Sequence, residues 1–199
     1  MSWNDFNTAD EQRDYDLIPK GTLARVRMTI RPGGLNEPAQ GWTGGYATRG
    51  KSNDSVYLDC EFVILEGKYA KRKVWTLIGL YSPKGPDWGN QGRAFIKGIL
   101  NSSRRLSPKD NSPEALARRR IAGFQELDGV EFVAKIDIEH GDRGDKNIIK
   151  LAITPDHKEY AALMGGAGYT APAAGYAPPA AAQQSVPAAT PTNRPSWAQ

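Results

Sequence analysis

The chain has 199 residues, a net charge of +4 and a single cysteine. One cysteine excludes an internal disulfide framework and a cysteine-rich zinc site, and no apolar run approaches the ~18 residues of a membrane-spanning helix. The first residues are polar and acidic, unlike a signal peptide, so we expect a cytoplasmic protein that has no contact with a membrane.

Charge and composition divide the chain into three parts. Residues 1–20 form an acidic arm with a net charge of −3, whereas residues 49–105 carry a net charge of +6. Residues 166–199 include 11 Ala, 6 Pro and one charged residue, Arg194. Such a composition buries too little apolar surface to offset the entropy of ordering, which predicts a disordered tail. Between arm and tail we predict one folded domain over residues 21–165.

The first predicted strand covers residues 22–31. Its apolar side chains alternate with polar ones, among them Arg25 and Arg27. A period of two places the apolar side chains on a core face and the arginines on the opposite face.

Residues 32–54 are rich in glycine and show no periodicity, which predicts a long loop. Long loops in compact domains are usually functional or disordered. The glycines of the loop make a purely structural tryptophan there less expected. We therefore predict a ligand-binding role for the aromatic and basic residues of this loop: Trp42, Tyr46, Arg49 and Lys51.

Two further strands are predicted over residues 55–65 and 73–81. The first alternates apolar residues with polar ones and with Tyr57, whereas the second is apolar on both faces and leaves the side of Trp75 open. The turn between them reads "EGKYAKRKVW". A turn needs only glycine and a few polar residues. The additional aromatic and basic residues therefore indicate binding: Tyr69, Lys71, Arg72 and Lys73.

The remaining elements are a helix over about 90–103, a short helix that begins at Ser112 and Pro113, strands over 130–140 and 148–154, and a last short helix. Five strands with the helices between the third and the fourth is the order of an OB-fold. We predict a mainly β protein: a five-stranded OB-fold-like barrel with a helical insertion between strands 3 and 4, plus the disordered tail. Another small α+β sheet is compatible with the same order.

OB-folds bind oligonucleotides or oligosaccharides on strands 2 and 3, with the flanking loops contributing. Single-stranded nucleic acid needs cations that follow its phosphates and aromatic faces that stack its bases, at ~1–3 kcal/mol per base. Both are enriched here. The candidate cations are Arg25, Arg27, Arg49, Lys51, Lys71, Arg72 and Lys73, and the candidate stacking residues are Trp42, Tyr46, Tyr57, Tyr69 and Trp75.

Two motifs suggest other chemistry. The stretch "GYATRGKS", residues 45–52, matches the P-loop pattern, but an apolar strand does not precede it and a strand rather than a helix is predicted to follow. The carboxylates of "DRGDKN" lack the spacing of a calcium loop. We therefore predict no catalytic residue, metal or cofactor. The alternatives to a nucleic-acid-binding protein are a P-loop-like nucleotide-binding enzyme that uses residues 45–52 and a protein–protein adaptor with a basic surface.

The segments "DLIPKGT" (16–22), "FVILEGKYAKRKVW" (62–75) and "LDGVEFVAKIDIE" (127–139) resemble a phage- and prophage-type family of single-stranded-DNA-binding proteins, long catalogued as a domain of unknown function. The resemblance covers about residues 14–160. It implies a compact OB-type domain without catalytic residues that supports phage or mobile-element DNA recombination or replication. Relative to shorter members, residues 32–54 are an insertion. Recruitment of recombination or replication proteins by the tail is the corresponding expectation, although its end lacks an acidic tip.

Overall fold

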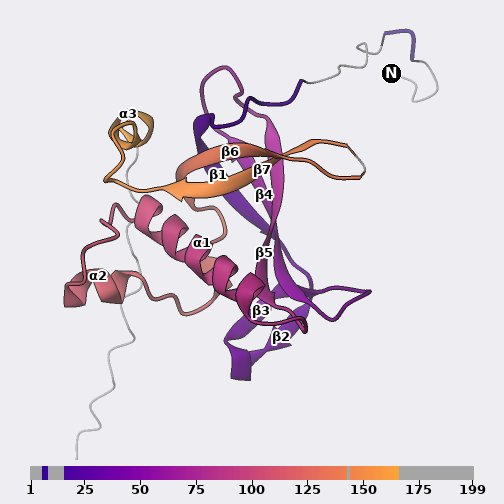
Figure 1. The fold of residues 1–199 in the computed structure, drawn as a ribbon, viewed down its shortest axis with the longest axis vertical. Coiled ribbons are helices and arrows are strands. Elements are labelled where there is room, and N and C mark those ends of the chain that lie inside the picture. The colour runs from indigo at the N-terminus through magenta and orange to yellow at the C-terminus, as the bar shows by residue number, and fades with distance from the viewer. Residues whose placement is uncertain (1–5, 9–15, 143, 166–199) are drawn as a thin grey trace, which may run out of the picture. The chain divides into compact units, whose positions relative to one another are not determined.

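The computed structural model describes residues 6–8, 16–142 and 144–165 (Figure 1). The predicted tail and most of the predicted acidic arm lie outside these residues. The strands are β1 (Leu23–Arg31), β2 (Leu35–Glu37), β3 (Trp42–Arg49), β4 (Val56–Ile64), β5 (Lys73–Tyr81), β6 (Glu131–Glu139) and β7 (Lys146–Ile153). The helices are α1 (Asp87–Ser103), α2 (Pro113–Arg118) and α3 (Tyr160–Met164), with short 3-10 turns at Pro38–Gln40 and Phe124–Glu126.

The seven strands of the described residues form one open antiparallel sheet. Its order is β2-β3-β4-β1-β6-β7, and β5 pairs with the other edge of β4. The predicted five-stranded barrel is therefore wrong in two respects, because the sheet has two more strands and is not closed. The edge strands β5 and β7 still approach each other. The backbone N–H of Ile149 in β7 donates to Thr76 Oγ1 in β5 at 2.9 Å.

The two additional strands come from the residues predicted to be a loop. β2 pairs with β3, and β3 pairs with the first residues of β4 through Thr48 and Arg49. Gly44 and Gly45 both have positive φ, 76° and 70°, and interrupt the alternation along β3. Such glycines remove the period-two signal by which a strand is recognised in sequence. The loop prediction for residues 32–54 is therefore wrong.

The core lies on one face of the sheet, where the predicted apolar faces of β1 and β4 are confirmed. Met28 of β1 is paired with Phe62 of β4, and both side chains are fully buried. Burying a side chain of this size contributes about 1.5–3 kcal/mol. The buried alternating residues of these two strands are Ala24, Val26, Met28, Ile30, Val56, Leu58, Cys60, Phe62 and Ile64.

Helix α1, predicted from about residue 90, begins at Asp87 and packs against β5, β6 and β7 (Figure 1). Its N-terminal half lies directly on the backbone of β5. A Cβ atom on Gly92 would lie 1.8 Å from the carbonyl oxygen of Gly79, and one on Gly89 would lie 2.7 Å from that of Leu80. Only glycine allows this approach, so the first turns of α1 are held beside the end of β5.

The remaining predicted elements are confirmed with small shifts at their ends. Ser112 caps α2 by accepting a hydrogen bond from the N–H of Ala115 at 3.2 Å. The sequence "GDRGDKN" joins β6 to β7 as the predicted hairpin. Helix α3 is shorter than predicted, and its Tyr160 and Met164 pack on Val133 of β6. Consequently α3 covers part of the sheet surface that faces away from the main core.

Candidate nucleic-acid interface

The face of β1, β4 and β5 that points away from the core carries four of the twelve predicted site residues. We call it the outer face. It contains Arg27, Thr29, Arg31, Tyr57, Asp59, Glu61, Val63, Lys73, Trp75 and Leu77. The pairing register aligns these residues in rows across the strands, with Glu61 beside both Trp75 and Thr29.

Trp75, which the sequence left unassigned, lies on the outer face. Its neighbour Val74 is buried, whereas the Trp75 side chain is 46% exposed and Leu77, two residues along β5, is 50% exposed. The indole N–H of Trp75 donates to Glu61 Oε2 at 3.2 Å. This bond fixes the ring at the surface of the sheet and leaves an apolar, partly aromatic strip along β5.

The cations beside this strip are paired with surface carboxylates. Lys73 Nζ lies 2.9 Å from Glu61 Oε1, and Arg31 Nε lies 3.6 Å from Asp59 Oδ2. About half of the Lys73 and Arg31 side chains is exposed. Exposed pairs of this kind contribute only about 0–1 kcal/mol. A phosphate group can therefore replace the carboxylate at little energetic cost.

Arg25 and Arg27 share one carboxylate but differ in exposure. Glu131 of β6 lies 2.5 Å from Arg25 Nη2 and 2.6 Å from Arg27 Nη2, and the side chains of Arg25 and Arg27 are 13% and 54% exposed. Burial alone would raise the pKa of Glu131, but hydrogen bonds from Arg27 and Arg25 outweigh it, and the pKa is below its ordinary value. Arg27 is accessible to a ligand, whereas Arg25 is enclosed in the ion pair.

The turn after β4 has two residues with positive φ and is closed by backbone hydrogen bonds. Gly67 and Lys71 both have positive φ, 81° and 68°, and the N–H of Lys71 donates to the carbonyl of Ile64 at 2.7 Å. Tyr69 packs against the core, with Lys68 Nζ at 5.3 Å and Arg72 Cζ at 5.8 Å from its ring centroid. Tyr69 therefore organises the turn, and Lys71 is left exposed at its tip.

The predicted residues of β3 are divided between core and surface. Trp42 and Tyr46 are half-buried and pack against the core. Arg49 pairs with Glu37 at 2.7 Å and lies 3.8 Å from Asp54, while Lys51 is exposed in the turn between β3 and β4.

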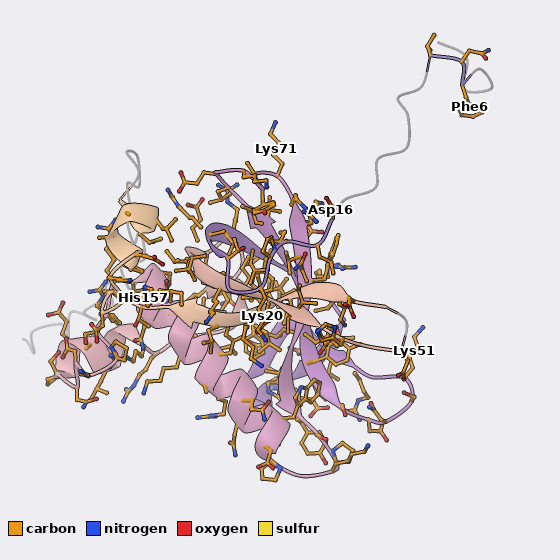
Figure 2. All side chains as sticks on the ribbon, turned by 45° about the horizontal axis from the view of Figure 1, so that its top comes forward. Phe6, Asp16, Lys20, Lys51, Lys71 and His157 are labelled. Atoms are coloured by element: carbon orange, nitrogen blue, oxygen red, sulfur yellow. The ribbon has the colours of Figure 1, made fainter. Side chains whose placement is uncertain are left out.

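The basic residues at the two ends of β4 are not brought together. Lys51 precedes β4 and Lys71 follows it, and nine strand residues correspond to about 27 Å. Figure 2 shows the two lysines projecting at well-separated positions. They therefore lie at opposite ends of the outer face.

Tyr57 has an aromatic partner that sequence reasoning missed. Trp88, at the start of α1, lies with its ring centroid 6.3 Å from that of Tyr57, and a Cβ on Gly79 would lie 2.4 Å from the Trp88 ring. The glycine inside the apolar strand β5 was the available signal, because such a residue often marks a close approach. Trp88 therefore adds an aromatic ring from the first turn of α1 to the surface around Tyr57.

The P-loop pattern at residues 45–52 occurs in a different structural context from the one it requires. β3 ends at Arg49, a turn follows, and β4 begins at Val56. The helix N-terminus that would hold a phosphate after Lys51 is not formed.

Neither the comparison with protein-family models nor that with curated proteins found a match. Among the described residues, the helices are all too short or too polar to cross a membrane.

Proposed function

We propose that this protein is a non-enzymatic single-stranded-DNA-binding protein and that the strand lies along the outer face. The observation that carries the proposal is the exposed strip of Trp75 and Leu77 beside Lys73 and Arg31. An unpaired base stacks its flat face on Trp75, and the phosphates of the strand bind the neighbouring cations. A duplex presents no free base faces, so single strands are preferred.

The strand pairing supports an OB-like assignment within the larger sheet. The path β5-β4-β1-β6-β7 uses five strands, and its two ends approach each other at Thr76 and Ile149. A partly open five-stranded barrel has the same strand path and the same approach of its end strands. Helices α1 and α2 follow β5, the third strand of this path in chain order. On that alignment β4 and β5 are barrel strands 2 and 3, whose outward face is the usual ligand face.

The predicted residues have different roles under this proposal. Trp75 and Tyr57 stack bases, and Arg27, Lys71, Arg72 and Lys73 contact phosphates. Arg31, which was not predicted, joins these cations because it lies on the outer face beside them. Arg25 holds Glu131 in place, and Tyr69 supports the turn. The resemblance of residues 14–160 to phage-type single-strand-binding proteins supports a role in phage or mobile-element DNA recombination or replication, in the cytoplasm of a bacterial cell.

The test is a titration with a labelled oligonucleotide, single- and double-stranded, at two salt concentrations, with tryptophan fluorescence followed in the same samples. If ~4–6 phosphates are neutralised, the slope of log affinity against log salt on single strands is about −3 to −4. Trp75→Leu weakens binding by about 5- to 150-fold, the loss of one stacked base, whereas Trp75→Phe retains a ring and most of the affinity.

A slope near zero, or equal affinity for duplex, would contradict the proposal. Binding of ATP that is lost in Lys51→Ala would instead favour a nucleotide-dependent enzyme. A protein partner captured equally well after nuclease treatment would favour an adaptor.

A further inference from the structure

A hollow that is separate from the outer face lies between β3, α1 and the segment that follows α2. We call it the Trp42 hollow. It has a volume of about 660 Å³ and contains aromatic and aliphatic side chains and three cations, but no carboxylate. Its lining includes Trp42, Leu80, Arg93, Lys97, Arg119 and Ile121.

The three cations of the Trp42 hollow are not equivalent. The Arg119 guanidinium is occupied, because it donates to Asn101 Oδ1 at 2.7 Å and to the carbonyl oxygens of Ser107 and Asp110. Arg93 and Lys97 lie one helical turn apart on α1, and both are exposed. Within the described part of the chain, neither has a carboxylate within ion-pairing distance. They are therefore available to an anionic ligand.

The apolar side of the hollow is formed by half-buried residues. Trp42 packs against the core and presents the remainder of its ring to the hollow, beside Leu80 and Ile121. A flat apolar group fits against these side chains, and an attached anionic group then lies near α1. A nucleotide has both parts, a base that stacks on tryptophan and a phosphate that binds arginine and lysine.

The Trp42 hollow is adjacent to the end of the outer face. Trp88 lies against Gly79 of β5, and Gly92, the residue before Arg93, contacts the carbonyl oxygen of the same glycine. A smaller hollow of about 370 Å³ also includes Arg93 and Leu80, together with Tyr81, which is 48% exposed. Arg93 thus borders both hollows, and the exposed Tyr81 at the end of β5 borders the smaller one.

We propose that the Trp42 hollow binds a nucleotide of the single strand after the strand has passed the end of β5. The base stacks on Trp42, and Arg93 and Lys97 bind the phosphates. This inference rests on the proposed function, and it adds Arg93 and Lys97 to the DNA-binding residues. It also gives Trp42 a binding role although the ring is half-buried.

The experiment compares two oligonucleotides, of about 5 and about 15 nucleotides, near the limits for one OB domain. The test variant is Arg93→Gln with Lys97→Gln, and the matched control is Lys109→Gln with Lys158→Gln, which removes the same charge from exposed positions elsewhere. We expect the test variant to bind the short oligonucleotide like the wild type. For the long one, we expect affinity to fall about 10- to 30-fold near 0.1 M salt and the salt slope to decrease by about 1.4, the effect of two phosphates.

Trp42→Phe provides an independent readout, because it removes the Trp42 contribution to fluorescence quenching by the long oligonucleotide while a ring remains. Unchanged long-strand affinity and slope in the Arg93/Lys97 variant, or equal losses for both lengths, would overturn the inference and leave the proposed function intact. If the wild type binds neither oligonucleotide, the proposed function fails and this inference fails with it.

Discussion

Two groups of cations in the described residues look alike in sequence and differ in the structure. The α1–α2 arginines are Arg104, Arg118 and Arg119. Arg119 donates three hydrogen bonds to Asn101, Ser107 and Asp110, and Arg104 and Arg118 donate to each other's backbone carbonyl groups. Arg104 also lies 3.1 Å from Glu126 Oε2. These guanidinium groups hold the segment after α1 in place.

The β4–β5 turn cations, Lys71, Arg72 and Lys73, have looser surroundings. Lys73 is paired with Glu61 on the outer face, Arg72 lies beside the Tyr69 ring, and Lys71 is exposed. The half-buried carbonyl oxygen of Ser107 loses a partner that water replaces poorly if Arg119 is removed, whereas a carboxylate on the outer face is readily hydrated. The partner of a cation, rather than its charge, therefore indicates whether the cation supports the fold or is available to a ligand.

The largest expected effect is on stability, in Arg119→Ala. Three hydrogen bonds from a charged, partly buried donor are lost, so we expect the free energy of unfolding to fall by about 3–4 kcal/mol. Urea denaturation measures this change. Affinity for a short single strand, measured on the folded protein, should remain that of the wild type. A stable variant with weakened short-strand binding would reverse the roles of the two groups.

The second effect is on binding, in the triple variant Lys71→Asn, Arg72→Gln and Lys73→Gln. Asn is chosen at 71 because it tolerates the positive φ of that position. We expect about 100-fold weaker single-strand binding near 0.1 M salt, the effect of three phosphate contacts. The control is Lys109→Gln with Lys150→Gln and Lys158→Gln, which removes three charges from exposed positions elsewhere. The free energy of unfolding should change by no more than about 0.5 kcal/mol, and a larger loss would show that these cations support the fold.

The smallest effect is expected in Glu131→Gln, which tests whether the ion pair between Glu131 and Arg25 stabilises the fold. Removing the carboxylate leaves Arg25 without its ion-pair partner, and we expect a loss on the order of 2 kcal/mol at pH 7. The pKa of Glu131 is lowered by folding, so its stabilisation is complete above the unfolded-state pKa of about 4.3 and is lost as pH falls through the lower folded-state pKa. The free energies of unfolding of wild type and variant, measured by urea denaturation, should therefore converge as the pH falls below the unfolded-state pKa. A difference that persists in acid would show a packing role instead.

Much of the fold follows from local patterns. The alternation in β1 and β4, the cap at Ser112 and the Gly- and Asp-rich hairpin between β6 and β7 are each determined by neighbouring residues, and the predictions for them are confirmed. β2 and β3 were missed, because Gly44 and Gly45 interrupt the pattern and because β3 is specified by the pairing of its Thr48 and Arg49 with Tyr57 and Val56 at the start of β4.

The candidate site was predictable in composition but not in arrangement. Trp75 and Lys73 lie on the outer face, whereas Trp42, which the glycine-rich context favoured, packs against the core at a different place. Trp88 lies beside Tyr57, and Arg93 lines the same hollow as Trp42, because glycines in β5 and α1 allow the helix to approach the strand. No local pattern encodes that approach.

The sequence by itself determined which residue types are available: alternating strands with one apolar face, an excess of cations between residues 49 and 105, and aromatic residues among them. The tertiary structure decided which of these groups are accessible. Arg25 and Arg119 are engaged by partners 106 and 18 residues away in sequence, while Arg93 and Lys97 have no carboxylate partner in the described part of the chain. The physical reason is that desolvation and hydrogen bonding depend on neighbours in space.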